Sequence, residues 1–362
     1  MKKLGFGFMR LPLLDGSDPT SFDKEQICKM VDTFLDAGFT YFDTAYMYHN
    51  GKSEEMLREA LVERHPRDSF FLADKLPTMF LKQQEDVERI FNEQLARTGA
   101  QYFDNYLLHC LDSGNYPRAE QFDCFNFVLE MKKRGLVRHF GFSFHDSAAL
   151  LDEILTKHPE VEFVQLQINY LDWESERVQS RLCYETAVRH GKDVIVMEPV
   201  KGGTLAKLPP LAEKLLRGYA PEASNASWAI RYAASLPAVK VVLSGMSAFS
   251  QLSDNLSYMR DFQPLNDEEQ ALCAKVRSIL NHEIEIACTA CHYCTEGCPA
   301  GIAIPEYFAL YNRGADKERY QAQAADAGKA SDCLQCGQCE AHCPQHLQII
   351  DWLQRVAARY EE

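Results

Sequence analysis

The chain has 362 residues, of which 46% are hydrophobic and 25% charged, as in an ordinary soluble globular protein. Its formal net charge of −14 disfavours nucleic acid and anionic membrane surfaces as partners, because like charges repel. No apolar run approaches the ~20 residues of a membrane span, and Arg10 interrupts the apolar stretch at the N-terminus. We therefore expect a cytoplasmic protein with no nucleic-acid or membrane partner.

Ahead of residue 266, short apolar segments alternate with longer amphipathic ones. The short segments predict strands and the longer ones predict helices. The predicted strands are a segment at the N-terminus and residues 39–45, 69–76, 102–111, 138–145, 162–169, 193–200 and 239–246. The predicted helices include residues 53–65, 84–99, 122–135, 147–158, 174–191 and 223–236.

Eight such strand–helix units indicate an α/β protein with a (β/α)8 TIM barrel over residues 1–265, because regular alternation favours one closed parallel sheet. The alternative is an open doubly wound sheet. That fold usually carries a G-x-G-x-x-G turn after its first strand. The segment GFGFMRLP contains Gly5 and Gly7 but no third glycine, so the closed barrel is the expected fold.

Polar or charged residues lie at or near the ends of six successive predicted strands. They are Asp43, Lys75, His109, Ser143, Gln165 and Glu198. Any one of them alone is explained by a cap or by a satisfied buried group. Together they predict an active site, because barrel enzymes build theirs at the carboxyl ends of the strands.

Four residues of this region suit the reduction of a carbonyl group. Tyr48, just beyond the second strand, is the expected proton donor, and a neighbouring Lys75 ammonium is expected to favour its phenolate form. Asp43 would keep Lys75 charged and oriented, while His109 would hydrogen-bond a substrate oxygen or the tyrosine hydroxyl. No side chain supplies a hydride, so this chemistry implies a bound nicotinamide.

The distribution of cysteines sets the rest of the chain apart. Residues 266–280 predict a charged linker helix, and eight of the 13 cysteines follow in residues 281–362. They form the pattern C-x2-C-x2-C-x3-C-P twice. This spacing is that of bacterial two-cluster ferredoxins, in which the fourth cysteine of each run binds the other cluster. Two zinc ions, or a mixed site, are the alternative, because thiolates also bind zinc.

The pattern predicts two [4Fe–4S] clusters, each held by three cysteines of one run and one of the other. The first cysteine set is Cys288, Cys291, Cys294 and Cys343, and the second cysteine set is Cys333, Cys336, Cys339 and Cys298. Apolar stripes at helical spacing begin at Ile304 and Ile349, so we expect a small, mostly helical dicluster ferredoxin-like domain. His292, His342 and His346 stand at no cysteine position and are expected to be bystanders.

Five stretches before residue 260 match the motifs of a known family. They are FDTAYMYHNGKSEEMLREAL, LADK, YLLHCLDS, GLVRHFGFSFHD and VQLQINYLD. Through them the chain resembles the aldo-keto reductases, and with its cysteine segment it is similar to the branch that carries a C-terminal 4Fe-4S dicluster domain. The resemblance implies an NAD(P)H-dependent oxidoreductase acting on a carbonyl or alcohol, with a catalytic tetrad of Asp43, Tyr48, Lys75 and His109.

The resemblance also implies contacts with the nucleotide. Ser143 and Gln165 match positions that hold the nicotinamide amide, and Met197 stands where many members stack an aromatic ring on the nicotinamide. The stretch SGMSAFSQLSDN matches the part that grips the adenosine phosphate. Its implied contacts are Gly245, Ser247, Gln251, Asp254 and Asn255. Members that prefer NADPH often place Lys or Arg in this stretch, which here contains neither, so NADP(H) and NAD(H) both stay open.

Three functions fit these features. The barrel would act on a small-molecule carbonyl or alcohol while the clusters stabilise the protein, or the clusters would connect the barrel to an electron-carrier protein. In the third possible function, the barrel senses a nucleotide and the C-terminal cysteine segment binds a partner. Hydride transfer moves two electrons together, whereas clusters usually pass one electron at a time. A flavin commonly links two-electron and one-electron transfer. We identify no flavin motif in this sequence.

Overall fold

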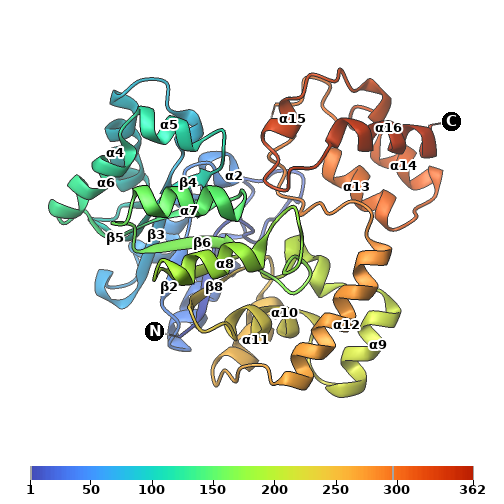
Figure 1. Cartoon of the computed structure of the whole chain (residues 1–362), viewed down its shortest axis with the longest axis horizontal. Coiled ribbons are helices and arrows are strands. Elements are labelled where there is room, and N and C mark those ends of the chain that lie inside the picture. The colour runs from blue at the N-terminus through green and yellow to red at the C-terminus, as the bar shows by residue number, and fades with distance from the viewer. Residues whose placement is uncertain (1, 296, 362) are drawn as a thin grey trace. The chain divides into compact units, whose positions relative to one another are not determined.

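The computed structural model describes residues 2–295 and 297–361. Its eight strands form a closed parallel barrel in which each strand pairs with the next and β8 returns to β1 (Figure 1). The strands are β1 (Leu4–Gly7), β2 (Tyr41–Asp43), β3 (Phe71–Leu76), β4 (Phe103–Leu111), β5 (Val137–Phe144), β6 (Phe163–Gln167), β7 (Asp193–Met197) and β8 (Val239–Gly245). The predicted barrel is confirmed, and every predicted strand overlaps an observed one.

Helices follow the strands along the chain and continue through the cysteine segment. The α-helices are α1 (Lys24–Asp36), α2 (Tyr48–Gly51), α3 (Ser53–Leu57), α4 (Glu85–Thr98), α5 (Tyr116–Gln121), α6 (Cys124–Lys133), α7 (Ala148–Lys157), α8 (Ser180–Arg189), α9 (Pro210–Tyr219), α10 (Asn225–Ala234), α11 (Phe249–Met259), α12 (Asp267–Glu283), α13 (Ile304–Asn312), α14 (Lys317–Gln323), α15 (Gln338–Ala341) and α16 (Ile349–Tyr360). The other helical turns are η1 (Arg58–Val62), η2 (Arg67–Ser69), η3 (Thr78–Phe80), η4 (Lys201–Ala206) and η5 (Ala330–Asp332).

Two predicted helices differ from the observed ones. Residues 53–65 form α3 followed by the π-helical η1, not one continuous α-helix. The helix expected over 174–191 begins only at Ser180, because Gln179 takes a left-handed backbone conformation (φ 54°). The N–H of Gln179 also donates to the carbonyl of Ser175, which closes a turn before the helix. In addition, α1 lies between β1 and β2, a helix whose residues the sequence analysis did not name.

Apolar side chains fill the interior of the barrel. One buried cluster consists of Tyr41, Ala73, Leu107, Phe163, Ile195, Val241 and Leu243. These residues come from six of the eight strands. They form a dry, packed interior, as in other barrels of this type, and polar residues at the strand ends therefore stand on a rigid base.

The chain divides into two compact units. Unit 1 contains residues 1–199 and 226–270, and unit 2 contains residues 200–225 and 271–362. The segment Val200–Asn225, which follows β7, therefore clusters with the cysteine segment, although the sequence places it between barrel elements. The predicted boundaries at 265 and 280 stay a prediction, and the helix expected over 266–280 is present as α12.

Unit 2 has its own hydrophobic core. Its buried members include Ile302, Ile304, Tyr307, Phe308, Tyr320, Leu347, Ile349, Leu353, Val356 and Tyr360, and cysteines of both runs pack against them. Most of these residues lie on α13 and α16, the two helices predicted from apolar stripes. The cysteine loops are therefore anchored by helices, as expected for a helical dicluster domain.

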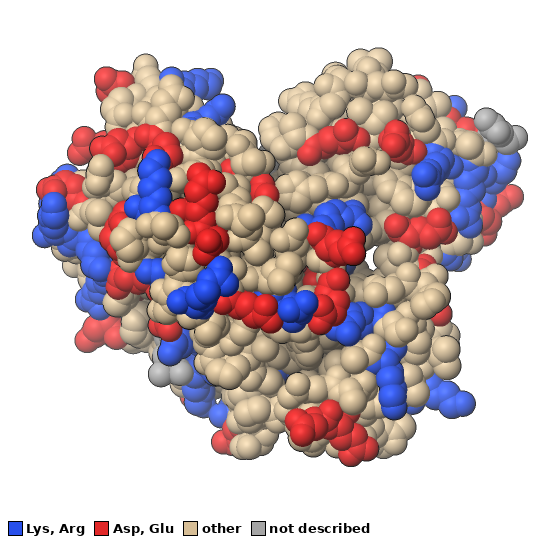
Figure 2. All heavy atoms as spheres, viewed as in Figure 1, with Lys and Arg blue, Asp and Glu red and all other residues tan. Residues whose placement is uncertain are grey.

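Charged side chains of both signs are interspersed on the face in Figure 2, where no broad basic patch appears. None of the helices in residues 2–295 and 297–361 has both the length and the apolar character needed to cross a lipid bilayer.

Candidate active site and cysteine pockets

The four predicted catalytic residues come from three adjacent strands and the loop that follows one of them. Asp43 ends β2, Lys75 lies near the end of β3, and His109 lies near the end of β4. Tyr48 opens α2, directly after β2. Because β2, β3 and β4 are neighbours in a parallel sheet, their carboxyl ends meet at the same edge of the barrel.

The Lys75 ammonium is the centre of this group. Its Nζ donates to Asp43 Oδ1 at 2.6 Å, to the Thr44 carbonyl at 2.8 Å and to the Tyr48 hydroxyl at 3.4 Å. The rings of Tyr48 and His109 meet edge-on, with centroids 6.0 Å apart. All four predicted residues are buried, and Lys75 is 0% exposed. A buried ammonium is tolerated only when its donors are paired, as they are here.

The loop after β2 is held by its own hydrogen bonds. Thr44 Oγ1 and Ser53 Oγ lie 2.9 Å apart, and Ser53 Oγ also donates to the Phe8 carbonyl. His49 follows Tyr48 in a left-handed conformation (φ 52°), and its ring binds the carbonyl of Pro19 at 2.7 Å. These contacts fix the direction in which the Tyr48 phenol leaves the backbone.

The effect expected of the Lys75 ammonium, which favours the Tyr48 phenolate, is outweighed by burial and by the charge of Asp43. Burial raises the pKa of Tyr48 well above its ordinary value, and the negative charge of Asp43 raises it further. Burial also raises the pKa of Asp43, although the adjacent Lys75 opposes that rise. The phenol is therefore protonated near neutral pH, which suits a group that donates a proton.

His109 is neutral in this environment. Burial lowers the pKa of its imidazole well below the ordinary range, and the charge of Lys75 acts in the same direction. Its Nδ1 is buried and has no hydrogen-bond partner within the described residues. A buried polar atom without a partner is costly, so His109 is suited to hydrogen-bond a molecule that enters the site.

A buried carboxyl pair behind Lys75 escaped the sequence analysis. Asp74 and Glu54 are both 0% exposed. Asp74 Oδ1 accepts the backbone N–H of Lys75 at 2.8 Å. The amide of Gln94 donates to Glu54 at 3.1 Å and to the Lys75 carbonyl at 3.0 Å, which joins the pair to β3. Burial raises the pKa of Asp74 well above its usual range, and the charge of Glu54 adds to the rise.

The residues implied for the nicotinamide amide lie side by side. Ser143 on β5 is in register with Gln165 on β6. Ser143 Oγ accepts the N–H of Cys110 at 2.7 Å, and Gln165 Nε2 lies 3.7 Å from the Met197 sulfur. Gln165 Oε1 is buried without a hydrogen-bond partner in the described part of the chain. An unpaired amide oxygen fits a site that receives an amide N–H from a bound group.

The residues implied for the adenosine phosphate follow β8. Gly245 ends the strand, Ser247 lies in the loop, and three residues lie on α11: Gln251, Asp254 and Asn255. Gln251 Oε1 accepts the N–H of Ser247 at 2.7 Å, whereas the Asn255 amide is buried and donates to the Ser244 hydroxyl at 2.9 Å. The Asn255 side chain thus supports the strand end, and the other four lie nearer the start of α11.

The structure adds Arg10, a cation that the sequence pattern did not place at this loop. A Cβ on Gly245 would lie 3.1 Å from the Arg10 side chain, and Ser247 Oγ donates to the Arg10 carbonyl at 3.2 Å. The guanidinium also lies 3.8 Å from Glu198, the sixth polar strand-end residue of the sequence analysis. Only the fold could reveal this, because Arg10 and Gly245 lie at opposite ends of the barrel sequence.

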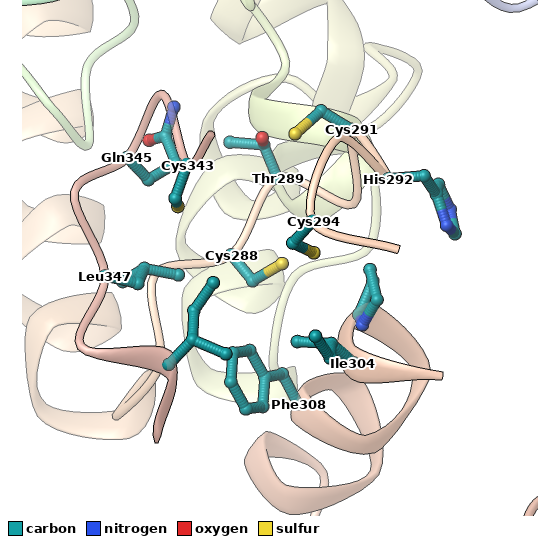
Figure 3. A pocket seen from close by; sticks show the side chains of 12 residues that line it. Cys288, Thr289, Cys291, His292, Cys294, Ile304, Phe308, Cys343, Gln345 and Leu347 are labelled. Carbon is teal, nitrogen blue, oxygen red and sulfur yellow. The ribbon is translucent and has the colours of Figure 1, made fainter. Parts of the chain in front are cut away.

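The cysteines line two pockets in unit 2. One is lined by the whole first cysteine set, together with apolar side chains that include Ile304, Phe308 and Leu347. Figure 3 shows Cys288, Cys291 and Cys294 on one loop and Cys343 on the opposite wall. The other pocket is lined by the whole second cysteine set. Three thiols of one run and one of the other thus surround each pocket, which is the arrangement that the spacing predicted.

The two cysteine runs repeat the same backbone. Ala290, His292 and Gly301 in the first run have positive φ, and so do Gln335, Gly337 and His346 at the corresponding positions of the second. The N–H of Gly301 donates to the Cys298 carbonyl, and that of His346 donates to the Cys343 carbonyl. Such turns direct backbone N–H groups inward, and the N–H of Ala290 lies 3.4 Å from the Cys288 sulfur.

The histidines of this segment lie near the cysteines, and His292 is among the residues that line the first pocket. His292, His342 and His346 are exposed, and Figure 3 shows His292 directed away from the cysteines. Among residues 2–295 and 297–361, no three His, Cys, Asp or Glu side chains are arranged to hold a single metal ion.

Family models match both parts of the chain. The aldo/keto reductase family model matches residues 3–278, and a 4Fe-4S dicluster domain model matches residues 287–348. The chain belongs to the aldo-keto reductase family and is an oxidoreductase of that family with a 4Fe-4S dicluster domain. The resemblance seen in the sequence is confirmed.

Individual relatives cover the barrel. The uncharacterized oxidoreductase YqkF of Bacillus subtilis is 22% identical over 69% of this chain and 87% of its own length. The uncharacterized oxidoreductase C215.11c of Schizosaccharomyces pombe is 25% identical over 71% of this chain and 81% of its own.

Solved structures share the barrel fold. The holo form of aldo-keto reductase AKR11C1 from Bacillus halodurans has a TM-score of 0.60 at 25% identity, over 76% of this chain and 91% of that chain. An aldo/keto reductase from Klebsiella pneumoniae in complex with NADP and acetate has a TM-score of 0.61 at 18% identity, over 76% of this chain and 90% of that chain.

Proposed function

We propose that the barrel interconverts a small-molecule carbonyl compound and its alcohol, using NADP(H) or NAD(H). The observation that carries this proposal is the buried Lys75 ammonium, which contacts Asp43 at 2.6 Å and the Tyr48 hydroxyl at 3.4 Å. A bound nicotinamide would supply or accept the hydride, which no side chain can do.

The side chains have distinct parts in this reaction. Tyr48 is the catalytic acid: its protonated phenol donates to the carbonyl oxygen as negative charge develops there. Lys75 stabilises the phenolate that this proton transfer leaves, and Asp43 positions Lys75. His109, neutral and with an unpaired Nδ1, would hydrogen-bond the same substrate oxygen.

For the nucleotide, the available polar atoms support binding along the strand ends from β5 to β8. Ser143 and Gln165 would hold the carboxamide, and Met197 would pack on the ring. Gly245, Ser247, Gln251 and Asp254 would contact the adenosine phosphate, and Asn255 would support them through its bond to Ser244. Arg10 beside Gly245 supplies the cation that the loop itself lacks, which supports NADP(H). The Klebsiella protein, which binds NADP, shares the fold.

For the metal, we propose two [4Fe–4S] clusters, one for each cysteine set. The donors are eight thiols with apolar side chains around them, and a backbone N–H lies close to one sulfur. This donor set suits iron–sulfur clusters, which supply one-electron transfer when bound. Iron and acid-labile sulfide content tests the proposal; about eight irons per chain are expected from two four-iron centres.

The activity is tested with anaerobic assays of NADPH and NADH oxidation against a panel of aldehydes and ketones. We expect Tyr48→Phe to lower kcat by about 10² to 10⁴-fold, because it removes the proton donor but keeps the ring. Tyr46→Phe is the matched control, since the Tyr46 hydroxyl donates to Glu93 and not to the Lys75 group. Equal activity of the Tyr48→Phe variant and the unaltered protein would refute the proposal. Rapid turnover in the unaltered protein would also exclude a pure nucleotide sensor.

A second candidate is electron exchange with an external one-electron carrier protein. The exposure of the second cysteine set favours it: Cys336 is exposed and the adjacent Leu334 is 69% exposed. Residues 333–339 contain no charged side chain, and the surface around α15 in Figure 2 is largely uncharged. Anaerobic protein reduced with dithionite should then reduce NADP+ or NAD+ when excess dithionite has been removed. Absence of nucleotide reduction would eliminate this candidate.

A further inference from the structure

The short connection after β7 has an unusual backbone. Lys201, Gly202 and Gly203 are consecutive residues with positive φ, at 47°, 61° and 96°. A left-handed conformation costs a non-glycine residue roughly 1–2 kcal/mol, so the surroundings must hold Lys201 in place. Its side chain is nevertheless long and charged, and the residue is only 1% exposed. A lysine is rarely buried to this extent unless its charge interacts with something.

Gly202 brings this connection against the first cysteine loop. A Cβ on Gly202 would lie 2.0 Å from the carbonyl oxygen of Thr289, so the two backbones are in direct contact. Thr289 follows Cys288 and lines the pocket of the first cysteine set, as Figure 3 shows. Residues 200–225 and the cysteine segment belong to the same compact unit. Lys201 is thus held beside the first cysteine loop.

The electrostatic surroundings of the two cysteine runs differ accordingly. The Lys201 charge acts on the Cys288 thiol in the direction opposite to that of Glu306. In the second run, the charge of Glu340 acts on the Cys339 thiol. The first run also contains the buried Cys294, whereas the second contains the exposed Cys336.

We propose that Lys201 raises the reduction potential of the cluster bound by the first cysteine set. Reduction adds one negative charge to a cluster that four thiolates already make negative. An ammonium fixed nearby stabilises the reduced form more than the oxidised form, and burial strengthens this effect because the local dielectric constant is low. The effect is larger on this cluster than on the second, because Lys201 lies beside the first cysteine loop.

The test is a redox titration of the full chain, followed by electron paramagnetic resonance. Lys201→Gln and Lys201→Met remove the charge, Lys201→Arg keeps it, and Lys207→Gln removes an exposed lysine from the same segment. In the two charge-removing variants, one of the two reduction steps should move to a more negative potential. The ratio of reduced to oxidised cluster at a fixed potential should fall by about threefold or more. Lys201→Arg and Lys207→Gln should titrate like the unaltered protein.

Each alternative outcome is distinguishable. The inference rests on the proposal of two clusters, which iron and sulfide content tests separately from the potentials. The affected step is assigned with Cys336→Ser, which perturbs the second cluster; a Lys201 effect on that same step would overturn the inference. So would unchanged potentials in fully loaded Lys201→Gln protein. Loss of iron in both Lys201→Gln and Lys201→Met would show that Lys201 serves cluster assembly, and this too would overturn it.

Discussion

The barrel site and the cysteine pockets position their functional groups in different ways. In the barrel, Lys75 is fixed by bonds to Asp43 and the Thr44 carbonyl, and the strands that carry these residues are tied into a closed sheet. In unit 2, the thiols lie on loops whose turns require left-handed residues, including Ala290 and Gln335. The comparison indicates that the barrel site is held by hydrogen bonds among its own groups, whereas we expect the cysteine loops to depend on the clusters proposed above.

The largest expected effect follows from removing the iron. Chelation under oxidising conditions should raise the rate at which a protease cleaves residues 288–346 by about tenfold or more, because metal binding and local folding are coupled. The barrel should stay protected, since its core contains no cysteine of either set. Limited proteolysis of the full chain with mass spectrometry measures both rates. A cysteine segment that stays equally resistant without iron would show that its fold does not depend on the clusters.

A smaller effect is expected from adding one methyl group to the connection after β7. Gly202→Ala places a Cβ 2.0 Å from the Thr289 carbonyl oxygen, so backbone must move, at a cost of about 3 kcal/mol from overpacking and strain. Gly203→Ala is the matched control: φ is also positive there, but a Cβ would meet nothing within 4 Å, which leaves a strain of about 1 kcal/mol. The measurement is the temperature at which the visible absorbance of the clusters is lost.

The ranking of these two variants tests the contact itself. Gly202→Ala should lower the bleaching temperature well below that of Gly203→Ala, and iron content before heating should be equal or lower in Gly202→Ala. If both variants behave alike, backbone strain alone determines the outcome and the close approach to Thr289 does not hold in solution.

Much of the barrel site could be predicted from the sequence, because strand ends can be recognised from hydrophobic alternation. Asp43, Lys75 and His109 end successive strands, and in a parallel barrel such ends must meet. The cysteine sets were equally visible, since ligand spacing within a run is local. Both inferences depend on short-range patterns that a fold of known type converts into proximity.

Long-range contacts and burial could not be predicted from short-range sequence patterns. The approach of Gly202 to Thr289 joins segments far apart in the chain, and so does that of Arg10 to Gly245. The protonated state of Tyr48 depends on its burial beside Asp43, which no spacing reveals. Sequence spacing does not predict the state of Asp74 either. Its place in a strand does not show that Glu54 is buried next to it.

The smallest predicted effect concerns Asp74 and its dependence on pH. The folded state raises its pKa above the unfolded value of ~3.9, so the folded chain holds this proton more tightly. The stability gained is therefore full below the unfolded pKa and is lost as pH rises through the folded pKa. Asp74→Asn does not titrate and keeps an oxygen for the Lys75 N–H. We expect it to be more stable than the unaltered chain at pH 7, by about 1 kcal/mol or more.

The difference should shrink as the pH is lowered toward 4, because the carboxyl of the unfolded chain is then increasingly protonated too. Urea unfolding followed by tryptophan fluorescence measures it, in a Trp352→Phe background, so that the remaining Trp173 and Trp228 report on the barrel. Asp68→Asn, at an exposed position, is the control and should change stability by less than about 0.5 kcal/mol. An Asp74→Asn variant that is less stable at pH 7, with the pH slope of the unaltered chain, would mean that Asp74 is ionised. The barrel would then contain a second buried charge next to Lys75. The barrel site would depend on that charge as well as on the hydrogen bonds among its own groups.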